Sequence, residues 1–248
     1  MSLKITPILQ GASAQTRLPQ HPRLGPPDYT AKLAIDPQTC EDAYRLRYES
    51  YLTSGYIEPN ETSRFIDDYD AMANSRTVVI YRNDVPLASV RVSLLVAGSG
   101  LRSPGADTFP EAVKRLLADT PFSASGPGRG LELTRLVRSP AAQNNQGLVF
   151  LLYRVAGYLG MMAHAQVGFA CVRKNHVSFY KRLGYRPETE LRPYPGLNCP
   201  MQLMSSNRQR YDEIRASFPL IDPFTSATDG LENLLSGGSV ALWLRGAA

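Results

Sequence analysis

The sequence predicts an α/β chain (α+β in the order of its elements) with a mixed central sheet flanked by helices. Three observations predict this class. Strand-like and helix-like apolar patterns are interleaved in the order β-α-β-β-(α)-β-α-β-α-β-β. Two strand-like runs flank Asn83-Asp84, a dipeptide typical of a tight hairpin. A strand at 130–138 is followed by a polar loop and then by a long apolar helical run, 147–165.

The first elements are a short strand at 31–35 and a helix after it. Thr39 is predicted to cap that helix, with Asp42 three residues later in a pattern like a capping box. The spacing of its tyrosines places three of them on one helix face: Tyr44, Tyr48 and Tyr51.

A loop over 53–76 follows, and it carries the acidic stretch FIDDYD. The hairpin consists of strands at 77–81 and 86–96. In the second of these strands, residues at alternate positions share a face. Ala88, Val90, Val92 and Leu94 form the core face, and Ser89, Arg91 and Ser93 form the opposite one.

The second half begins with the loop-rich segment 97–129 around a helix at Pro110–Ala118. After the central strand the chain breaks at Pro140 and enters the loop AQNNQ, which ends at Gly147. The remaining elements are expected at 147–165 (helix), 167–173 (strand), 176–184 (helix, stopped by Gly184), 185–191 and 198–204 (strands) and Arg208–Ala216 (helix).

Three regions follow from this order. Residues 1–28 have no periodicity and are expected to be mobile or extended. Residues 29–204 hold the α/β domain. Residues 205–248 are a helical appendage and a weakly patterned tail, and covering a tunnel, dimerisation and membrane contact are its open alternatives.

The composition favours a soluble cytoplasmic protein. Hydrophobic residues make up 43% and charged residues 20% of the chain. The run 147–165 is interrupted by Arg154 and His164, so a core helix is favoured over a membrane span. The three cysteines lack metal or disulfide spacing, and the N-terminus lacks a secretory signal. The net charge of +5 is mostly arginine without a basic block, which favours an anionic substrate or acidic protein over nucleic acid.

Three motifs follow one another along the chain. They are an arginine and an aromatic residue on the first helix (Arg47, Tyr51), D-x-x-D followed by a strand arginine (Asp67, Asp70, Arg91) and E-x-[ST]-R on the fourth strand (Glu132, Thr134, Arg135). The order of the elements, with the loop after the fourth strand and FYKRLGY near the end, resembles the GNAT acyltransferase superfamily. Within it, the three motifs resemble acyl-homoserine-lactone synthases and FeeM-type N-acyl amino acid synthases, over about residues 31–204. The resemblance implies a GNAT-like, splayed central sheet.

The chain also departs from the family patterns. The tryptophan that homoserine-lactone synthases carry after the first helix is missing near Ile57, which favours a free amino acid as the acceptor. The phosphate loop appears only as N-N-Q-G-L, which suits an acyl carrier protein better than coenzyme A as the donor. Asn175 is two residues closer to Tyr180 than is common in the superfamily.

The resemblance implies two catalytic residues. Glu132 is predicted to be the general base that deprotonates the attacking amine, directly or through water. This role requires a cleft between the fourth and fifth strands that reaches Glu132. An exposed strand Glu paired with an arginine is the alternative. Tyr180 is predicted to protonate the departing thiolate, and a buried core tyrosine is the alternative.

Six residues are predicted to bind the acceptor. For four of them, Asp67, Asp70, Arg91 and Arg135, a structural or orienting role is favoured. A bidentate arginine suits an amino-acid carboxylate. The alternative for Arg91 and Arg135 is an ion pair with Asp67 or Asp70 that holds the acidic loop over the site. In a regular strand Arg135 would face away from Glu132, and only a bulge would bring the two side chains together. The six are Arg47, Asp67, Asp70, Arg91, Thr134 and Arg135.

The donor is predicted to be the 4'-phosphopantetheine thioester of an acyl carrier protein or acyl-CoA, with no bound cofactor and no metal. A helix N-terminus attracts anions, although a plain capping loop is the alternative. Phe150, Leu151, Leu152 and Met161 are core or acyl-tunnel residues, and His164 and His176 receive no catalytic role. The pantetheine-binding residues are expected to be Leu136, Val137, Asn144, Asn145, Gln146, Gly147 and Leu148.

Together these expectations describe an N-acyltransferase that joins a medium or long fatty acyl chain to the amine of an amino acid. Its partners are an acyl carrier protein, an amino acid and the acyl chain, with no nucleic acid. Two alternatives stay open: an acyl-homoserine-lactone synthase, and a non-catalytic acyl-binding module with the same fold.

Overall fold

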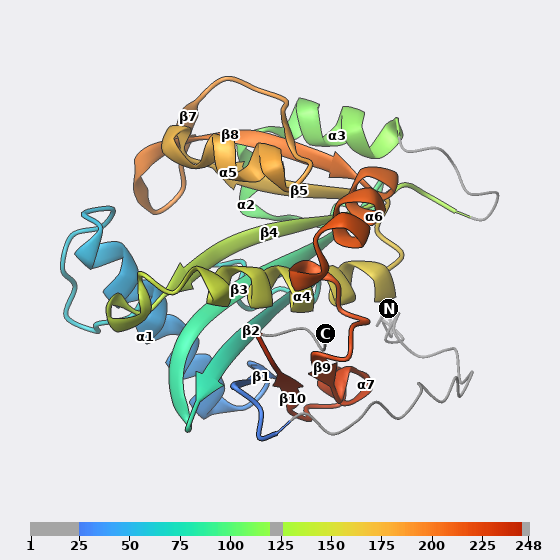
Figure 1. Ribbon diagram of the computed structural model, residues 1–248. Coiled ribbons are helices and arrows are strands. Elements are labelled where there is room, and N and C mark those ends of the chain that lie inside the picture. Colours follow the sequence, from blue (N-terminus) through green and yellow to red (C-terminus); the bar gives the residue numbers. More distant parts are fainter. Residues whose placement is uncertain (1–24, 120–125, 245–248) are drawn as a thin grey trace, which may run out of the picture.

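The computed structural model describes residues 25–119 and 126–244, which form a mixed α/β fold around one large sheet (Figure 1). Its strand order is β6-β8-β5-β4-β3-β2-β1-β10-β9, with β7 paired to β8. The strands are β1 Tyr29–Leu33, β2 Ser75–Arg82, β3 Val85–Val96, β4 Arg129–Arg138, β5 Val167–Val172, β6 Arg186–Pro187, β7 Arg192–Tyr194, β8 Leu197–Asn207, β9 Thr228–Asp229 and β10 Val240–Leu242.

Helices cover both faces of the sheet. α4 packs on one face together with the C-terminal elements, and α1 and α3 lie on the other (Figure 1). The α-helices are α1 Pro37–Thr53, α2 Pro104–Thr108, α3 Pro110–Ala118, α4 Gln146–Met162, α5 Val177–Arg182, α6 Arg208–Ser217 and α7 Leu231–Leu234. Three short 3₁₀ turns are η1 Pro140–Ala142, η2 Lys174–His176 and η3 Pro219–Ile221.

The centre of the sheet is splayed. β4 and β5 run parallel, and they pair only from Gly130↔Val167 to Leu133↔Ala170, although β4 continues to Arg138. The backbone of Arg135 has φ +52°, which is rare for a residue with a side chain, and the β3–β4 register shifts opposite it. This bulge bends β4 away from β5. The two strands therefore separate before either one ends.

The core helix α4 is fixed at the point where the strands part. Asn145 is its N-cap and accepts a hydrogen bond from the Gly147 amide at 3.1 Å. Its apolar residues, including Leu148, Leu151 and Leu152, are completely buried against β1–β4. The expected apolar helix is confirmed.

Several boundaries differ from the predictions. α1 begins after Asp36, which accepts a hydrogen bond from the Thr39 amide at 2.9 Å, so Thr39 is not the cap. Pro37 takes the first helical position, where its missing N–H costs nothing. β1 ends at Leu33, two residues earlier than expected. The strand expected at 185–191 is only Arg186–Pro187, and a further strand, β7, follows it.

The polar face of β3 is not exposed as its alternation suggests. Ser89, Arg91 and Ser93 are all inaccessible to solvent, because α1 and the acidic loop 53–74 cover that face. The hairpin prediction is confirmed: Asn83 and Asp84 both have positive φ, as a type I′ turn requires.

The C-terminal segment adds a strand where only a tail was expected. β10 pairs with β1, and the short β9 pairs with β10 at the edge of the sheet. β8 also runs across residue 204, where the domain boundary was placed. α6 matches the expected helical appendage. The segment 1–24, expected to be mobile, lies outside the described residues. Within the described part of the chain, no helix is long and apolar enough to cross a membrane.

Candidate active site

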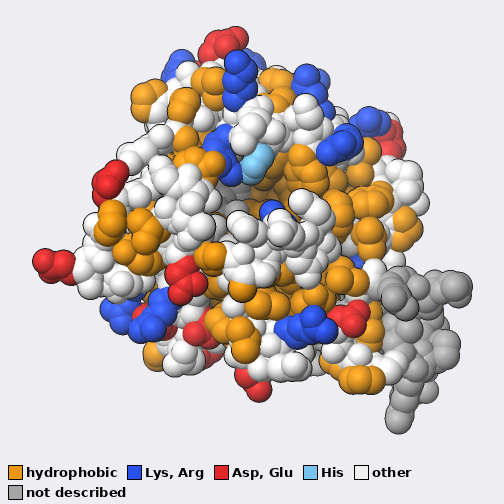
Figure 2. All heavy atoms as spheres, turned by 60° about the vertical axis from the view of Figure 1, so that its left-hand side comes forward, with side chains coloured by type: hydrophobic (Ala, Val, Ile, Leu, Met, Phe, Trp, Pro, Cys, Tyr) orange, Lys and Arg blue, Asp and Glu red, His pale blue; other side chains and the backbone are white. Residues whose placement is uncertain are grey.

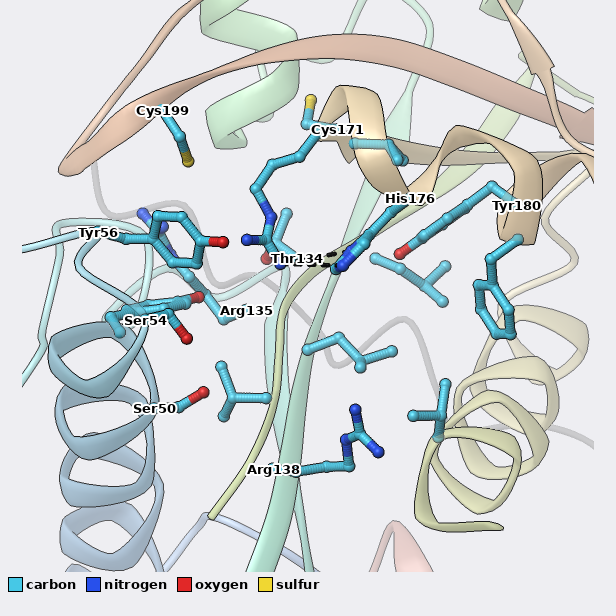
Figure 3. A pocket seen from close by; sticks show the side chains of 18 of the residues that line it. Ser50, Ser54, Tyr56, Thr134, Arg135, Arg138, Cys171, His176, Tyr180 and Cys199 are labelled. Carbon is cyan, nitrogen blue, oxygen red and sulfur yellow. Dashed lines mark hydrogen bonds between the residues drawn. The ribbon is translucent and has the colours of Figure 1, made fainter. Parts of the chain in front are cut away.

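A cleft of about 720 Å³ opens where β4 and β5 part (Figure 2). β4 and β5 form its floor, and the first turns of α4, the C-terminal end of α1 and α5 form its walls. Figure 3 shows Arg138 pointing into it from β4, with Tyr180 and His176 on the opposite wall. β4 and β5 are hydrogen-bonded to each other only before this point. The splay therefore makes room between them for an extended ligand.

The lining is apolar beside α4 and cationic elsewhere. Val149, Phe150 and Phe179 provide the apolar wall. No Asp or Glu of the described residues lines the cleft, and its charged lining residues are Arg135, Arg138, Arg173 and Arg182. Such a lining favours a ligand that has both an apolar part and an anionic group.

Glu132 lies behind this lining and does not line the cleft, so the expectation that the cleft reaches it directly is wrong. Its side chain is completely buried, and both carboxylate oxygens accept from the Gly105 amide, at 3.0 and 3.1 Å. The hydroxyl of Ser103 donates to the same carboxylate. A Cβ on Gly105 would lie 2.6 Å from Glu132 Oε1, so a side chain there would displace the carboxylate. The alternative of an exposed Glu paired with an arginine is wrong.

Two cleft residues connect the carboxylate with the open space. The Tyr194 hydroxyl lies 3.5 Å and Cys171 Sγ 3.9 Å from Glu132 Oε1, and both side chains line the cleft. Direct contact between Glu132 and a substrate amine is therefore excluded in this arrangement. The arrangement does allow proton transfer between Glu132 and the amine through one intervening group. Burial raises the pKa of Glu132, and its hydrogen bonds from Ser103 and Gly105 offset part of that rise.

Arginines and aspartates beside Glu132 form one buried ion network. Arg47 donates to Asp70 at 2.7 Å. Arg91 donates to Asp67 at 2.5 and 3.1 Å and lies 2.9 Å from Asp70. Arg135 donates to Asp67 at 2.7 Å. The network ties the acidic loop to α1, β3 and β4.

This geometry corrects the expected contact of these residues with the acceptor. Arg47, Asp67, Asp70 and Arg91 bind one another, and none of them lines the cleft. Arg91 also donates to Thr134 Oγ1 at 3.2 Å. The favoured alternative, ion pairs that hold the acidic loop over the site, matches the arrangement observed. Arginine suits this role because its fork of donors serves two carboxylates at once.

Arg135 differs from the rest of the network. It lines the cleft, together with Thr134, while its guanidinium remains paired with Asp67. The same group donates to the Pro195 carbonyl at 3.3 Å and lies 4.6 Å over the ring of Phe65. Its Nη1 is buried without a hydrogen-bond partner among the described residues. The bulge at Arg135 places its side chain both in the ion network and on the cleft lining.

The network sets the charge state of its acids. Burial by itself acts to raise the pKa of Asp67, but the hydrogen bonds and charges of Arg91 and Arg135 outweigh it and lower the pKa to about 2. Asp67 is therefore ionised across the physiological range, and the arginines it holds are compensated.

Tyr180 lines the cleft, in agreement with a role there, and also packs in an aromatic group. Its ring meets the rings of Tyr153, Phe179 and Tyr185 edge to face, with centroids 5.4 to 6.0 Å apart. Burial raises the pKa of Tyr180, so its hydroxyl stays protonated and able to donate.

The residues expected to bind pantetheine fall into two groups. Leu136, Val137, Asn144 and Gln146 line the cleft. Asn145, Gly147 and Leu148 do not: Asn145 caps α4 and donates to the Tyr29 hydroxyl at 2.9 Å, and Leu148 is core. Of the expected acyl-tunnel residues Phe150 lines the cleft, whereas Leu151 and Leu152 are core.

Sequence reasoning missed several residues of the site. Ser103 and Gly105 belong to α2, whose Ser-Pro start is a helix N-terminal signature that predicts it. Tyr194 comes from β7. His176, expected to have no role, lines the cleft with Arg173. No local pattern marks Tyr194, His176 or Arg173, because only tertiary packing brings them beside β4. No cluster of three or more potential metal ligands occurs in the described ranges.

The fold is GNAT-like, with a large mixed sheet that opens at its centre. A family model described as N-acyl amino acid synthase FeeM matches residues 42–207. The chain belongs to this family. A search of the curated proteins found none that is similar in sequence.

Solved structures share the fold at low sequence identity. FeeM, an N-acyl amino acid synthase from uncultured soil microbes, is similar with a TM-score of 0.62 and 13% identity, covering 77% of this chain and 99% of that one. The CoA-dependent acyl-homoserine lactone synthase BjaI gives 0.57 and 12%, covering 79% and 90%. The acyl-homoserine-lactone synthase LasI gives 0.53 and 14%, covering 72% and 90%.

Proposed function

We propose that this protein transfers a medium or long fatty acyl chain from the phosphopantetheine thioester of an acyl carrier protein to the amine of an amino acid. One observation carries the proposal. The cleft between the splayed strands is apolar on one wall and cationic elsewhere, and it ends at two residues in contact with a buried carboxylate. The acyl chain of a thioester matches the apolar wall, and an amine substrate that carries a negative charge matches the arginines.

The amine must lose a proton as it attacks the thioester carbonyl. Glu132 accepts this proton through Tyr194, whose hydroxyl lies 3.5 Å away, or through a water in the same position. The raised pKa of the buried carboxyl makes it a better base than an exposed Glu. Arg135, which lines the cleft, stabilises the developing oxyanion with its positive charge.

The pantetheine sulfur leaves as a thiolate, and Tyr180 supplies its proton. The arm itself lies along Leu136 and Val137 on the free edge of β4, where strand pairing to β5 has ended. The first turn of α4, with Asn144 and Gln146, receives the polar end of the arm.

An acyl carrier protein is the proposed donor because the outer wall of the cleft is basic. Lys174, Lys181 and Arg182 are exposed on η2 and α5, beside the cleft. A carrier presents its pantetheine from an acidic surface, which such residues attract. In contrast, the degenerate loop before α4 offers little to the pyrophosphate of coenzyme A.

An acyl-homoserine-lactone synthase is the second candidate, favoured by the shared fold of BjaI and LasI. The two activities give different products, N-acyl amino acids or N-acyl lactones. A non-catalytic acyl-binding module gives neither.

The test incubates purified protein with acyl-carrier thioesters of several chain lengths and each amino acid, with S-adenosylmethionine as a further acceptor, and identifies products by mass spectrometry. N-acyl amino acids are expected. Glu132→Gln keeps the shape of the side chain and removes the base, so we expect at least about 100-fold slower product formation.

Glu188→Gln is the matched control. Glu188 is equally a strand-associated carboxylate with hydrogen bonds, from Ser205 and Arg186, but it does not line the cleft. It should retain the wild-type rate. Lactones as the main product would contradict the proposal. An unchanged rate in Glu132→Gln would show that Glu132 is not the general base.

A further inference from the structure

Two half-buried arginines that line the cleft lack the acidic partners that the fully buried arginines near it possess. Arg47, Arg91 and Arg135 are each paired with Asp67 or Asp70. Arg138 and Arg173 form no ion pair with any described residue, although both are half-buried and line the cleft. Charges removed from water without a counter-ion are costly, so these two positions are suited to an anion from outside the chain.

Arg138 is the clearer of the two. Its Nη1 is buried without a hydrogen-bond partner among the described residues. Desolvation lowers the pKa of Arg138, and no nearby acid opposes this effect. Figure 3 shows its guanidinium pointing from the end of β4 into the open space of the cleft.

Arg173 approaches the same space from the end of β5. Its guanidinium lies 4.1 Å over the ring of Tyr56 and contacts the His176 ring at 3.2 and 3.4 Å. A ring nitrogen that accepts from Arg173 must be unprotonated. Partial burial, and then the charges of Arg173 and Arg138, lower the pKa of His176 and so keep the ring neutral. The stack and the hydrogen bond hold Arg173 in place without neutralising it.

We propose that Arg138 and Arg173 form a subsite for the oxyanion of a substrate bound in the cleft. Two sources provide such a group: the carboxylate of the amino-acid acceptor, which remains in the N-acyl product, and the phosphate of the pantetheine arm. The inference rests on the proposed function for these two ligands. It replaces Arg91, whose donors are occupied by Asp67, as the expected carboxylate-binding residue.

The geometry fits this assignment because the two arginines come from strands that have separated. β4 and β5 pair only up to Leu133 and Ala170, so Arg138 near the end of β4 and Arg173 just after β5 are no longer part of a paired ladder, and both line the cleft. A bound oxyanion would accept from Arg138 on one side and Arg173 on the other.

Binding measurements on the full chain test the subsite independently of catalysis. Two ligand pairs differ only in the anion: an N-dodecanoyl amino acid against its methyl ester, and 4'-phosphopantetheine against pantetheine. By calorimetry, at least one acid should bind about ten-fold or more tighter than its neutral partner. The pair that shows the preference identifies the source of the oxyanion.

Arg138→Gln should abolish that preference, and Arg138→Lys, which keeps the charge, should retain part of it. Arg45→Gln is the matched control, because Arg45 is an exposed arginine on α1 away from the cleft. Its preference should equal that of the wild type. Circular dichroism of each variant verifies that it is folded.

The titration of His176 gives a second readout. Followed by NMR and assigned with His176→Gln, its pKa should rise when the acid binds, because the anion offsets the charges of Arg138 and Arg173. Arg138→Gln should raise it without ligand. Equal binding of acids and neutral partners, no binding of either acid, or a preference that survives Arg138→Gln would overturn the subsite. A failed acyl-transfer assay with a retained preference would overturn only the proposed function.

Discussion

At the residue scale, the site depends on how each buried charge is compensated. Asp67 is held by two arginines from neighbouring strands, Arg91 and Arg135. Removing one partner of a buried pair leaves the other charge uncompensated, which typically costs about 3–5 kcal/mol. The acidic loop is therefore fixed by a few charged contacts, and its position depends on pH.

Acid should weaken the fold through Asp67. Its pKa is lowered from 3.8 to about 2, so its contribution is present above about pH 3.8 and is lost as the pH falls towards 2. The difference corresponds to about 2 kcal/mol. Urea unfolding at about pH 5 and about pH 2.5 measures it.

The variant Asp67→Asn should be less stable than the wild type at about pH 5 and should lose less stability between the two pH values. Asp84→Asn, in the exposed hairpin turn, should follow the wild-type profile. An Asp67→Asn profile as steep as that of the wild type would mean that other carboxyl groups carry the acid sensitivity.

At the scale of the elements, the bulge in β4 and the helix after it create the cleft. α4 also contributes a wall between two spaces. Tyr153 and Leu133 line both the cleft and a smaller cavity of about 70 Å³ on the far side. Gly157 and Met161 line only that second pocket. Tyr153 therefore stands where a long acyl chain would stop.

Shortening this wall should change the acyl-chain preference of the proposed reaction. Tyr153→Ala joins the cleft to the second pocket, so longer chains should be accepted relative to the wild type. Competition between thioesters of different lengths, with products quantified by mass spectrometry, measures the shift. Tyr158→Ala removes an equally buried α4 tyrosine that lines neither space, and its preference should not move.

At the scale of the whole molecule, the C-terminal segment closes the sheet beside β1. Arg154, buried on α4, donates to the carbonyls of Leu220, Ala227 and Trp243 at 3.0, 2.8 and 3.1 Å. One guanidinium thus connects the core helix with three points of this segment. Burial lowers the pKa of Arg154 to about 10, so the group stays charged at neutral pH.

Replacing Arg154 by Met should loosen this segment. The three carbonyls lose a charged donor, and we expect a loss of about 2–3 kcal/mol in the free energy of unfolding. Amide hydrogen exchange should rise most in β10 and its partner β1. Arg210→Met, at an exposed pair on α6, should change neither quantity by a measurable amount. Uniform exchange across the chain would show that Arg154 does not act on the C-terminal segment in particular.

The sequence alone determined the order of the elements and much of their type. Periodicity gave α4, α3 and the hairpin, because these elements bury continuous or alternating apolar faces that depend only on local spacing. The motif around Glu132 indicated the strand where the sheet opens. The family model and the fold confirmed the resemblance on which that motif rests.

The tertiary structure decided which of those residues face a ligand. Spacing assigned Arg91 to an open face, but the acidic loop covers it and supplies its partner, Asp67. Nothing local distinguishes Arg91 from Arg138, since both are strand arginines. Whether a carboxylate folds back onto a guanidinium depends on contacts between residues distant in the sequence. The sequence therefore fixes which groups are present, and long-range packing fixes which remain unpaired.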